Sequence, residues 1–156
     1  MTQIYFRLDG RVALIIGGSR GIGEDIARVC ASAGAKVVIA SRYMENLKPV
    51  AGISPPPMQG IYAITKAGVI SMPKAFAKEL GPHGIRVNAI APGLTDTKFA
   101  SVLIQTKEIL EVALQSIPLN RYAAPVEMAG AALFLASDAS AFVNGAVLTI
   151  DGGAVV

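Results

Sequence analysis

Cysteine, histidine and tryptophan are nearly absent from this sequence: it has one cysteine, Cys30, one histidine, His83, and no tryptophan. A single cysteine excludes a disulfide bond within the chain, and no cluster of metal-ligating residues accompanies it. We therefore expect no metal site, a core position for Cys30 on the apolar face of a helix, and a structural role for His83 in the turn from Gly81 to Gly84.

Long apolar runs and blocks of like charge are also missing. Nowhere do about 18 apolar residues follow one another, and residues 1–7 lack the apolar stretch and cleavage site of a leader. The formal net charge is +3, but the cationic residues are dispersed, which disfavours a nucleic-acid surface. The sequence thus predicts a cytoplasmic protein with no nucleic-acid or membrane partner.

The composition is that of a well-buried globular protein. Its 156 residues are 53% hydrophobic and 16% charged, enough for one domain with a substantial core. Apolar runs alternate with helical patterns along the chain, which is typical of an α/β fold with a parallel sheet. We predict a single domain over residues 1–156.

A glycine-rich turn follows the first apolar run. A strand over 12–16 leads through Gly17 and Gly21 to Gly23, and a helix is expected over about 21–33. Glycine suits a tight bend at Gly17, close approach of a pyrophosphate at Gly21, and close packing of helix on strand at Gly23. The free N–H groups at the start of the helix favour a phosphate. An ordinary strand-to-helix turn is the alternative.

The second strand ends at a cationic residue. Residues 36–40 form a short apolar run suited to a strand buried on both faces, and Ser41 and Arg42 follow it. In a unit that binds a nicotinamide dinucleotide, a carboxylate at this point would bind the hydroxyls of the adenosine ribose and would repel a 2′-phosphate. Arg42 together with Arg20 could instead bind that phosphate. The sequence therefore favours NADP(H) over NAD(H). Two surface arginines without a ligand are the alternative.

A proline-rich linker over 43–61 precedes a long helical pattern that ends at Leu80. Tyr62 and Lys66 are four residues apart and so share one helical face. Pro73 lies inside this pattern, where it costs about 3 kcal/mol unless a kink absorbs it.

The remaining chain supplies two more strands. We expect a strand over 85–90, a loop over 91–97, helices over about 98–115 and 125–137, and a last strand over 146–150. Right-handed crossovers then give a Rossmann-like doubly wound parallel sheet of about four strands in the order 2-1-3-4. Its ligand crevice would lie between the glycine turn and the 92–97 loop.

Four linked motifs resemble the short-chain dehydrogenase/reductase family. They are Gly17–Gly23, Tyr62-x-x-x-Lys66, Ile85-Arg-Val-Asn-Ala-Ile-Ala-Pro-Gly93 and Asp151-Gly-Gly153, in the family's order. The resemblance implies hydride transfer between NADP(H) and a carbonyl or alcohol substrate. Tyr62 would be the general acid or base, and the Lys66 ammonium would favour its phenolate form. The cofactor would contact Gly17, Ser19, Arg20, Gly21, Ile22, Gly23, Arg42, Lys66, Pro92, Gly93, Leu94, Thr95 and Thr97.

The chain departs from the family between Arg42 and Val50. Family members carry two helix–strand repeats there, with an asparagine of the proton relay and a strand ending in the catalytic serine. The serine position falls on Pro49, Ser54 is the nearest serine before Tyr62, and Ile16 stands where a threonine is usual. Three hypotheses follow: an NADP(H)-dependent reductase, a cofactor-binding remnant, or an interaction module. Uncovered apolar sheet surface predicts a homo-oligomer, and in the interaction module the exposed sheet edge and late helices would pair with a full-length relative.

Overall fold

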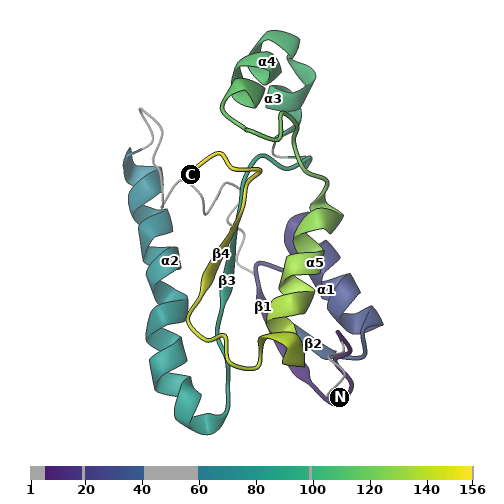
Figure 1. The fold of residues 1–156 in the computed structure, drawn as a ribbon, viewed down its shortest axis with the longest axis vertical. Coiled ribbons are helices and arrows are strands. Elements are labelled where there is room, and N and C mark those ends of the chain that lie inside the picture. Colours follow the sequence, from purple (N-terminus) through teal and green to yellow (C-terminus); the bar gives the residue numbers. More distant parts are fainter. Residues whose placement is uncertain (1–5, 19, 41–59, 99, 156) are drawn as a thin grey trace. The chain divides into compact units, whose positions relative to one another are not determined.

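The computed structural model describes residues 6–18, 20–40, 60–98 and 100–155, and the side chains of residues 60–66 lie outside this description. In chain order the elements are β1 (Val12–Ile16), α1 (Ile22–Ser32), β2 (Lys36–Ala40), α2 (Gly60–Leu80), the 3-10 helix η2 (Gly81–His83), β3 (Ala89–Pro92), α3 (Ser101–Gln105), α4 (Lys107–Gln115), α5 (Pro125–Ala136), the 3-10 helix η3 (Asp138–Ser140) and β4 (Val147–Ile150) (Figure 1). They divide into two compact units. Unit 1 is 1–43 with 124–142, and unit 2 is 44–123 with 143–156.

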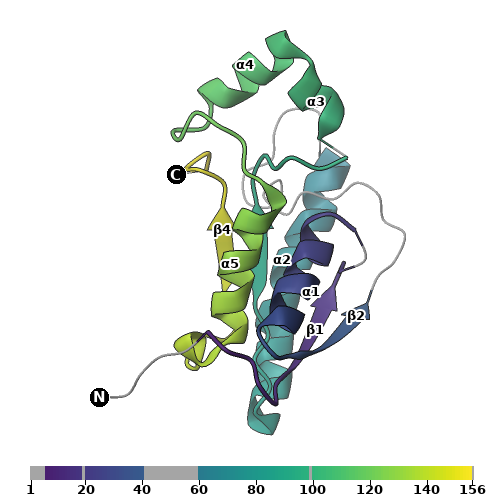
Figure 2. The ribbon, with the colours of Figure 1, turned by 90° about the vertical axis from the view of Figure 1, so that its right-hand side faces the viewer.

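Unit 1 pairs a small parallel sheet with two helices. β1 and β2 are parallel neighbours, in register from Val12 opposite Lys36 to Ile16 opposite Ala40. α1 packs against both strands and lies beside α5 (Figures 1 and 2). The bounds predicted for both strands and for α1 are confirmed to within a residue or two. Cys30 is buried with Leu8 and Met128 in the core of this unit, as the apolar face of α1 predicts.

The burial predicted for the strand over 36–40 is wrong. Val38 and Ile39 are about half exposed, and on β1 the alternate residues Val12, Leu14 and Ile16 are 67%, 62% and 67% exposed. α1 packs on a sheet of two strands from one side, and successive side chains of a strand point to opposite faces. The side chains that point away from α1 therefore form an open apolar face.

Unit 2 contains the second parallel pair. β3 and β4 are in register from Ala89 opposite Val147 to Pro92 opposite Ile150 (Figure 1). The strand predicted over 85–90 thus begins four residues later than expected. Side-chain amides take the place of the ladder before it: the Val87 N–H donates to Asn144 Oδ1 at 2.9 Å, and the Ala146 N–H donates to Asn88 Oδ1 at 2.9 Å.

The long helix and the helical region after the β3 loop also differ from expectation. α2 runs as one helix through Pro73, and beyond it Asn144 Nδ2 donates to the Ala77 carbonyl at 3.2 Å. The helix predicted over 98–115 is split into α3 and α4 at Thr106, whose backbone is extended. The Thr106 hydroxyl donates to the Val102 carbonyl at 2.8 Å and so ends α3. The helix expected over 125–137 is confirmed, with Pro125 in its first turn.

The two observed pairings are the outer pairs of the predicted order 2-1-3-4. The middle pairing, of β1 with β3, would join the two units and stays a prediction, as does the single domain. Among the described helices, none is both long and apolar enough to span a bilayer.

Candidate cofactor and active site

Glycine is required at four positions of the turn in unit 1, by the backbone angle at Gly17 and Gly21 and by close packing at Gly18 and Gly23. Gly17 and Gly21 have φ values of +89° and +53°, a region that glycine enters at little cost. A Cβ on Gly23 would lie 2.2 Å from the Gly17 carbonyl oxygen, and one on Gly18 would lie 3.0 Å from Cγ2 of Ile39. The bend expected at Gly17 and the helix–strand packing expected at Gly23 are therefore present.

α1 begins at Ile22, directly after this turn. The N–H groups of Glu24 and Asp25 donate to the Gly21 carbonyl at 3.0 and 3.1 Å. The Glu24 carboxylate is bound to Arg28 at 2.7 Å, and this hydrogen bond raises the pKa of the Arg28 guanidinium. The positive end of the α1 dipole lies beside a turn rich in glycine, which suits a phosphate.

Two of the predicted cofactor residues of unit 1, Ser19 and Arg42, lie outside the described residues. Arg20 is exposed in the turn and Ile22 begins α1.

The loop after β3 is held against the end of β4. The Gly93 N–H donates to the Ile150 carbonyl at 2.9 Å, which continues the parallel ladder by one step. A Cβ on Gly93 would lie 2.6 Å from the Cα of Asp151, so only glycine fits there without a shift. The predicted cofactor residues Pro92 and Gly93 therefore have a fixed backbone position.

Hydrogen bonds within the loop use the hydroxyl groups of both predicted threonines. Thr95 is 3% exposed, and its hydroxyl donates to the Gly93 carbonyl at 3.1 Å. The Thr97 hydroxyl accepts from the Ala100 N–H at 3.4 Å. The Ala123 N–H donates to the Leu94 carbonyl at 2.9 Å, and the Asp96 N–H donates to the Ala123 carbonyl at 2.8 Å. The loop is thus braced on two sides by hydrogen bonds within the protein.

Tyr62 and Lys66 lie in the first two turns of α2, in the same unit as this loop. Their spacing of one helical turn is as predicted, while their side chains lie outside the described part of the chain. Pro49 and Ser54 lie outside it as well. The catalytic roles of Tyr62 and Lys66 stay predictions.

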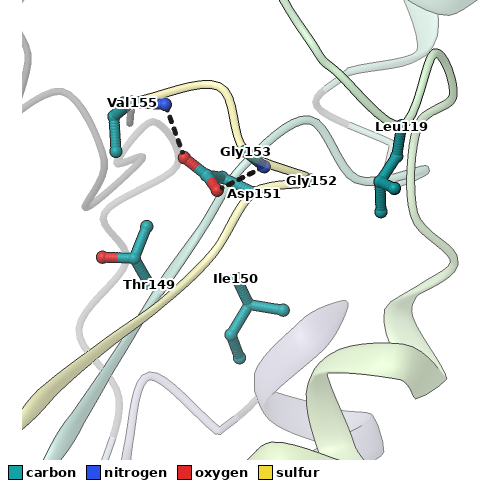
Figure 3. Close-up of a pocket in the computed structure, with 7 residues that line it drawn as sticks. All are labelled: Leu119, Thr149, Ile150, Asp151, Gly152, Gly153 and Val155. Atoms are coloured by element: carbon teal, nitrogen blue, oxygen red, sulfur yellow. Dashed lines mark hydrogen bonds between the residues drawn. The ribbon is translucent and has the colours of Figure 1, made fainter.

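An open pocket of about 660 Å³ lies at the carboxyl end of β4 (Figure 3). Asp151 Oδ1 accepts from the Gly153 N–H and Oδ2 accepts from the Val155 N–H, both at 3.0 Å. The lining residues are Leu119, Thr149, Ile150, Asp151, Gly152, Gly153 and Val155. None of these residues is among the predicted site residues, although the Asp-Gly-Gly turn follows a parallel strand at the edge where α/β proteins bind ligands.

Within the described residues, no three His, Cys, Asp or Glu side chains gather in a way that could hold a metal ion.

Two family models cover almost the whole chain. Residues 46–155 match the model described as enoyl-(acyl carrier protein) reductase, and residues 11–53 match the model described as short chain dehydrogenase.

Several curated relatives are 3-oxoacyl-[acyl-carrier-protein] reductases by name. The 3-oxoacyl-[acyl-carrier-protein] reductase FabG of Thermotoga maritima is 49% identical over 111 residues, which is 71% of this chain and 44% of that protein. The enzyme of the same name from Chlamydia trachomatis is 44% identical over 108 residues, 69% of this chain and 43% of that protein. This chain spans less than half the length of either relative.

Solved structures share the fold. The Pseudomonas aeruginosa RhlG/NADP active-site complex aligns with a TM-score of 0.84 and 25% identity over 99% of this chain and 100% of that chain. A putative 2-deoxy-D-gluconate 3-dehydrogenase from Agrobacterium tumefaciens with bound NADP aligns with a TM-score of 0.77 and 25% identity over 96% of this chain and 98% of that chain. With the parallel α/β architecture and both family models in agreement, the chain belongs to the short-chain dehydrogenase/reductase family and has its Rossmann-type fold.

Proposed function

We propose that this chain reduces the keto group of a 3-oxoacyl thioester with NADPH. The observation that carries the proposal is the close-packed glycine turn, in which a Cβ on Gly23 would lie 2.2 Å from the Gly17 carbonyl oxygen. The names of the curated relatives support the acyl thioester, and two NADP complexes among the similar structures support the cofactor.

Unit 1 would bind the phosphate end of NADP(H). Gly21 would let the backbone approach a pyrophosphate, Gly17 makes the bend and Gly23 lets α1 pack on the turn. Ser19 and Ile22 are the remaining predicted contacts of this segment. Arg20 and Arg42 would contact the 2′-phosphate, which a guanidinium binds through paired charge-assisted hydrogen bonds.

Unit 2 would bind the nicotinamide end. The backbone of Pro92, Gly93 and Leu94, with Thr95 and Thr97 buttressing it from within the loop, would position the ring and its carboxamide. The bracing of this loop supports the role, because a site organised before binding loses less entropy when the cofactor arrives.

The proton would come from Tyr62. NADPH supplies a hydride to the carbonyl carbon when it is bound, so negative charge develops on the carbonyl oxygen. The Tyr62 hydroxyl would donate its proton to that oxygen, and the Lys66 ammonium would stabilise the phenolate that remains. The product is a 3-hydroxyacyl thioester, and water restores the proton to Tyr62.

One observation favours a second candidate, a cofactor-binding protein of low activity. The serine position of the family falls on Pro49, which has no hydroxyl to stabilise the oxyanion. Loss of one such donor costs about 10²–10³ in rate. The open apolar face of Val12, Leu14 and Ile16 supports a homo-oligomer in either case, and it is the feature that an interaction module would use.

NADPH binding and NADPH oxidation separate these candidates. We expect NADPH to raise the melting temperature, acetoacetyl-CoA to cause a loss of absorbance at 340 nm, and Tyr62→Phe to abolish that loss while NADPH still raises the melting temperature. A shift without oxidation would support the cofactor-binding protein, and no shift would leave the interaction module. Oxidation that persists in Tyr62→Phe would exclude Tyr62 as the acid.

A further inference from the structure

We propose that the pocket at the carboxyl end of β4 binds the acyl chain of the thioester. We call it the acyl pocket, and its residues are Leu119, Thr149, Ile150, Asp151, Gly152, Gly153 and Val155. The inference rests on the proposed function, since it assigns the part of the substrate that the hydride-transfer chemistry leaves unplaced.

The chemistry of the walls fits a hydrocarbon chain. Leu119, Ile150 and Val155 contribute aliphatic side chains from three different points of the wall (Figure 3). The only ionisable group in the lining is Asp151, and both of its carboxylate oxygens accept backbone N–H groups of the turn that follows β4. Leu119 is 64% exposed, so a chain seated beside it would remove apolar surface from water.

The pocket adjoins the loop proposed to hold the nicotinamide. Gly93 follows β3 and its N–H donates to the Ile150 carbonyl, and a Cβ on Gly93 would meet Asp151 at 2.6 Å. Ile150 and Asp151 are both part of the pocket lining. An acyl chain in the pocket would therefore lie next to the loop proposed to hold the nicotinamide, at the carboxyl edge where parallel sheets bind their ligands.

Two parts of the pocket lining, the 117–119 segment and the turn after β4, are fixed to each other. The Leu119 N–H donates to the Gly152 carbonyl at 3.2 Å. A Cβ on Gly152 would lie 2.8 Å from Cγ2 of Ile117, and one on Gly153 would lie 3.0 Å from Cγ of Pro118. The 117–119 segment thus packs directly on the turn after β4. A pocket of about 660 Å³ with fixed walls is within the range of small-molecule sites and larger than a two-carbon acyl group requires.

The absence of tryptophan gives a direct test. Leu119→Trp places the only tryptophan of the chain at the pocket, and Val112→Trp places it on α4, at a residue that is 67% exposed and outside the lining. Decanoyl-CoA, which has no keto group to reduce, is the probe. We expect a saturable blue shift of emission in Leu119→Trp, no shift in Val112→Trp, and no shift of either variant with coenzyme A alone.

A second measurement covers the case in which the indole ring itself fills the pocket. Decanoyl-CoA should raise the melting temperature of the unaltered chain more than acetyl-CoA does, and Leu119→Gln should weaken decanoyl-CoA binding at least fivefold while NADPH binding stays within twofold. Equal shifts with decanoyl-CoA and acetyl-CoA, or equal emission changes in the two tryptophan variants, would overturn the acyl pocket.

The outcomes keep the two proposals apart. If decanoyl-CoA binds at the pocket but acetoacetyl-CoA causes no NADPH oxidation, the proposed reduction is excluded and the acyl pocket is supported. If acetoacetyl-CoA causes NADPH oxidation but acyl chain length has no effect on binding, the acyl pocket is excluded and the proposed reduction is supported.

Discussion

Gly93 packs against Asp151 with no space for a side chain between them: a Cβ on Gly93 would lie 2.6 Å from the Cα and 2.7 Å from the Cβ of Asp151. This contact joins the end of β3 to the end of β4, one step beyond the last paired residues, Pro92 and Ile150. Backbone rather than a flexible side-chain tip meets the added atom, so the two strand ends must move apart to accept it.

Gly93→Ala should therefore destabilise the protein and disturb the loop. We expect the free energy of unfolding to fall by about 1–3 kcal/mol, the usual cost of an overpacked site, and NADPH affinity to fall with it. Gly68→Ala is the matched control, because a Cβ at Gly68 in α2 meets nothing within 4 Å and alanine favours a helix by about 0.5–1 kcal/mol. Urea unfolding measures both variants; equal stability of the two would show that the contact is unimportant.

Gly23→Ala should push the start of α1 away from the glycine turn. The added Cβ would lie 2.2 Å from the Gly17 carbonyl oxygen and 2.9 Å from the Cα of Gly18, so α1 must shift away from β1. We expect a loss of at least about 2 kcal/mol in the free energy of unfolding, since backbone cannot rotate aside as a side chain can. NADPH affinity should also fall at least tenfold.

Gly130→Ala is the control for this variant, because it lies in α5 of the same unit and its Cβ would meet nothing within 4 Å. It should keep NADPH affinity and gain stability. Unchanged NADPH affinity in a folded Gly23→Ala variant would argue against the turn as the phosphate site.

Local features of this chain could be predicted from the sequence. Apolar runs bounded by glycine set β1 and β2, and the helical spacing of Ile26 and Cys30 set the buried face of α1. The predicted α/β class follows from the same alternation of strand and helix, and the family comparisons agree with it.

The sequence predictions were wrong where the structure of one segment depends on contacts with a distant segment. The residues before β3 look like a strand because Ile85 and Val87 are β-branched, yet the side chains of Asn88 and Asn144 bind the backbone there. Likewise, the composition of residues 36–40 suits burial, but burial depends on what covers the sheet. The acyl pocket was missed because the contact of Leu119 with Gly152 joins segments more than thirty residues apart.

Arg42→Ala tests the preference for NADPH. If the guanidinium binds the 2′-phosphate, the variant should lose about 1.5–3 kcal/mol of NADPH binding, roughly 10- to 150-fold, and NADH binding should stay nearly constant. Arg7→Ala removes the same charge from an exposed pair with Asp9 and should leave both affinities unchanged. Titration of each variant with both cofactors gives the comparison. Equal losses for NADPH and NADH in Arg42→Ala would remove this residue from the 2′-phosphate site.

Cys30 gives a prediction about pH that needs no assumption about function. It is 2% exposed in the core of unit 1, and burial raises the pKa of its thiol. Below the unfolded pKa, about 8.5, both states hold the proton, and above it the unfolded chain ionises first. Stability should therefore decline from about pH 8.5 upward until the folded pKa is reached, by at most about 1.4 kcal/mol per pH unit.

Cys30→Ala removes this ionisation and creates a small cavity. Its free energy of unfolding should be lower at pH 7 and should decline less between pH 8 and pH 10 than that of the unaltered chain. Urea unfolding at a series of pH values measures the difference, and a thiol reagent should react with folded Cys30 far more slowly than with the unfolded chain, because the thiolate is the reactive form. Parallel pH profiles for the two proteins, with rapid labelling of the folded chain, would show that the thiol is accessible to water.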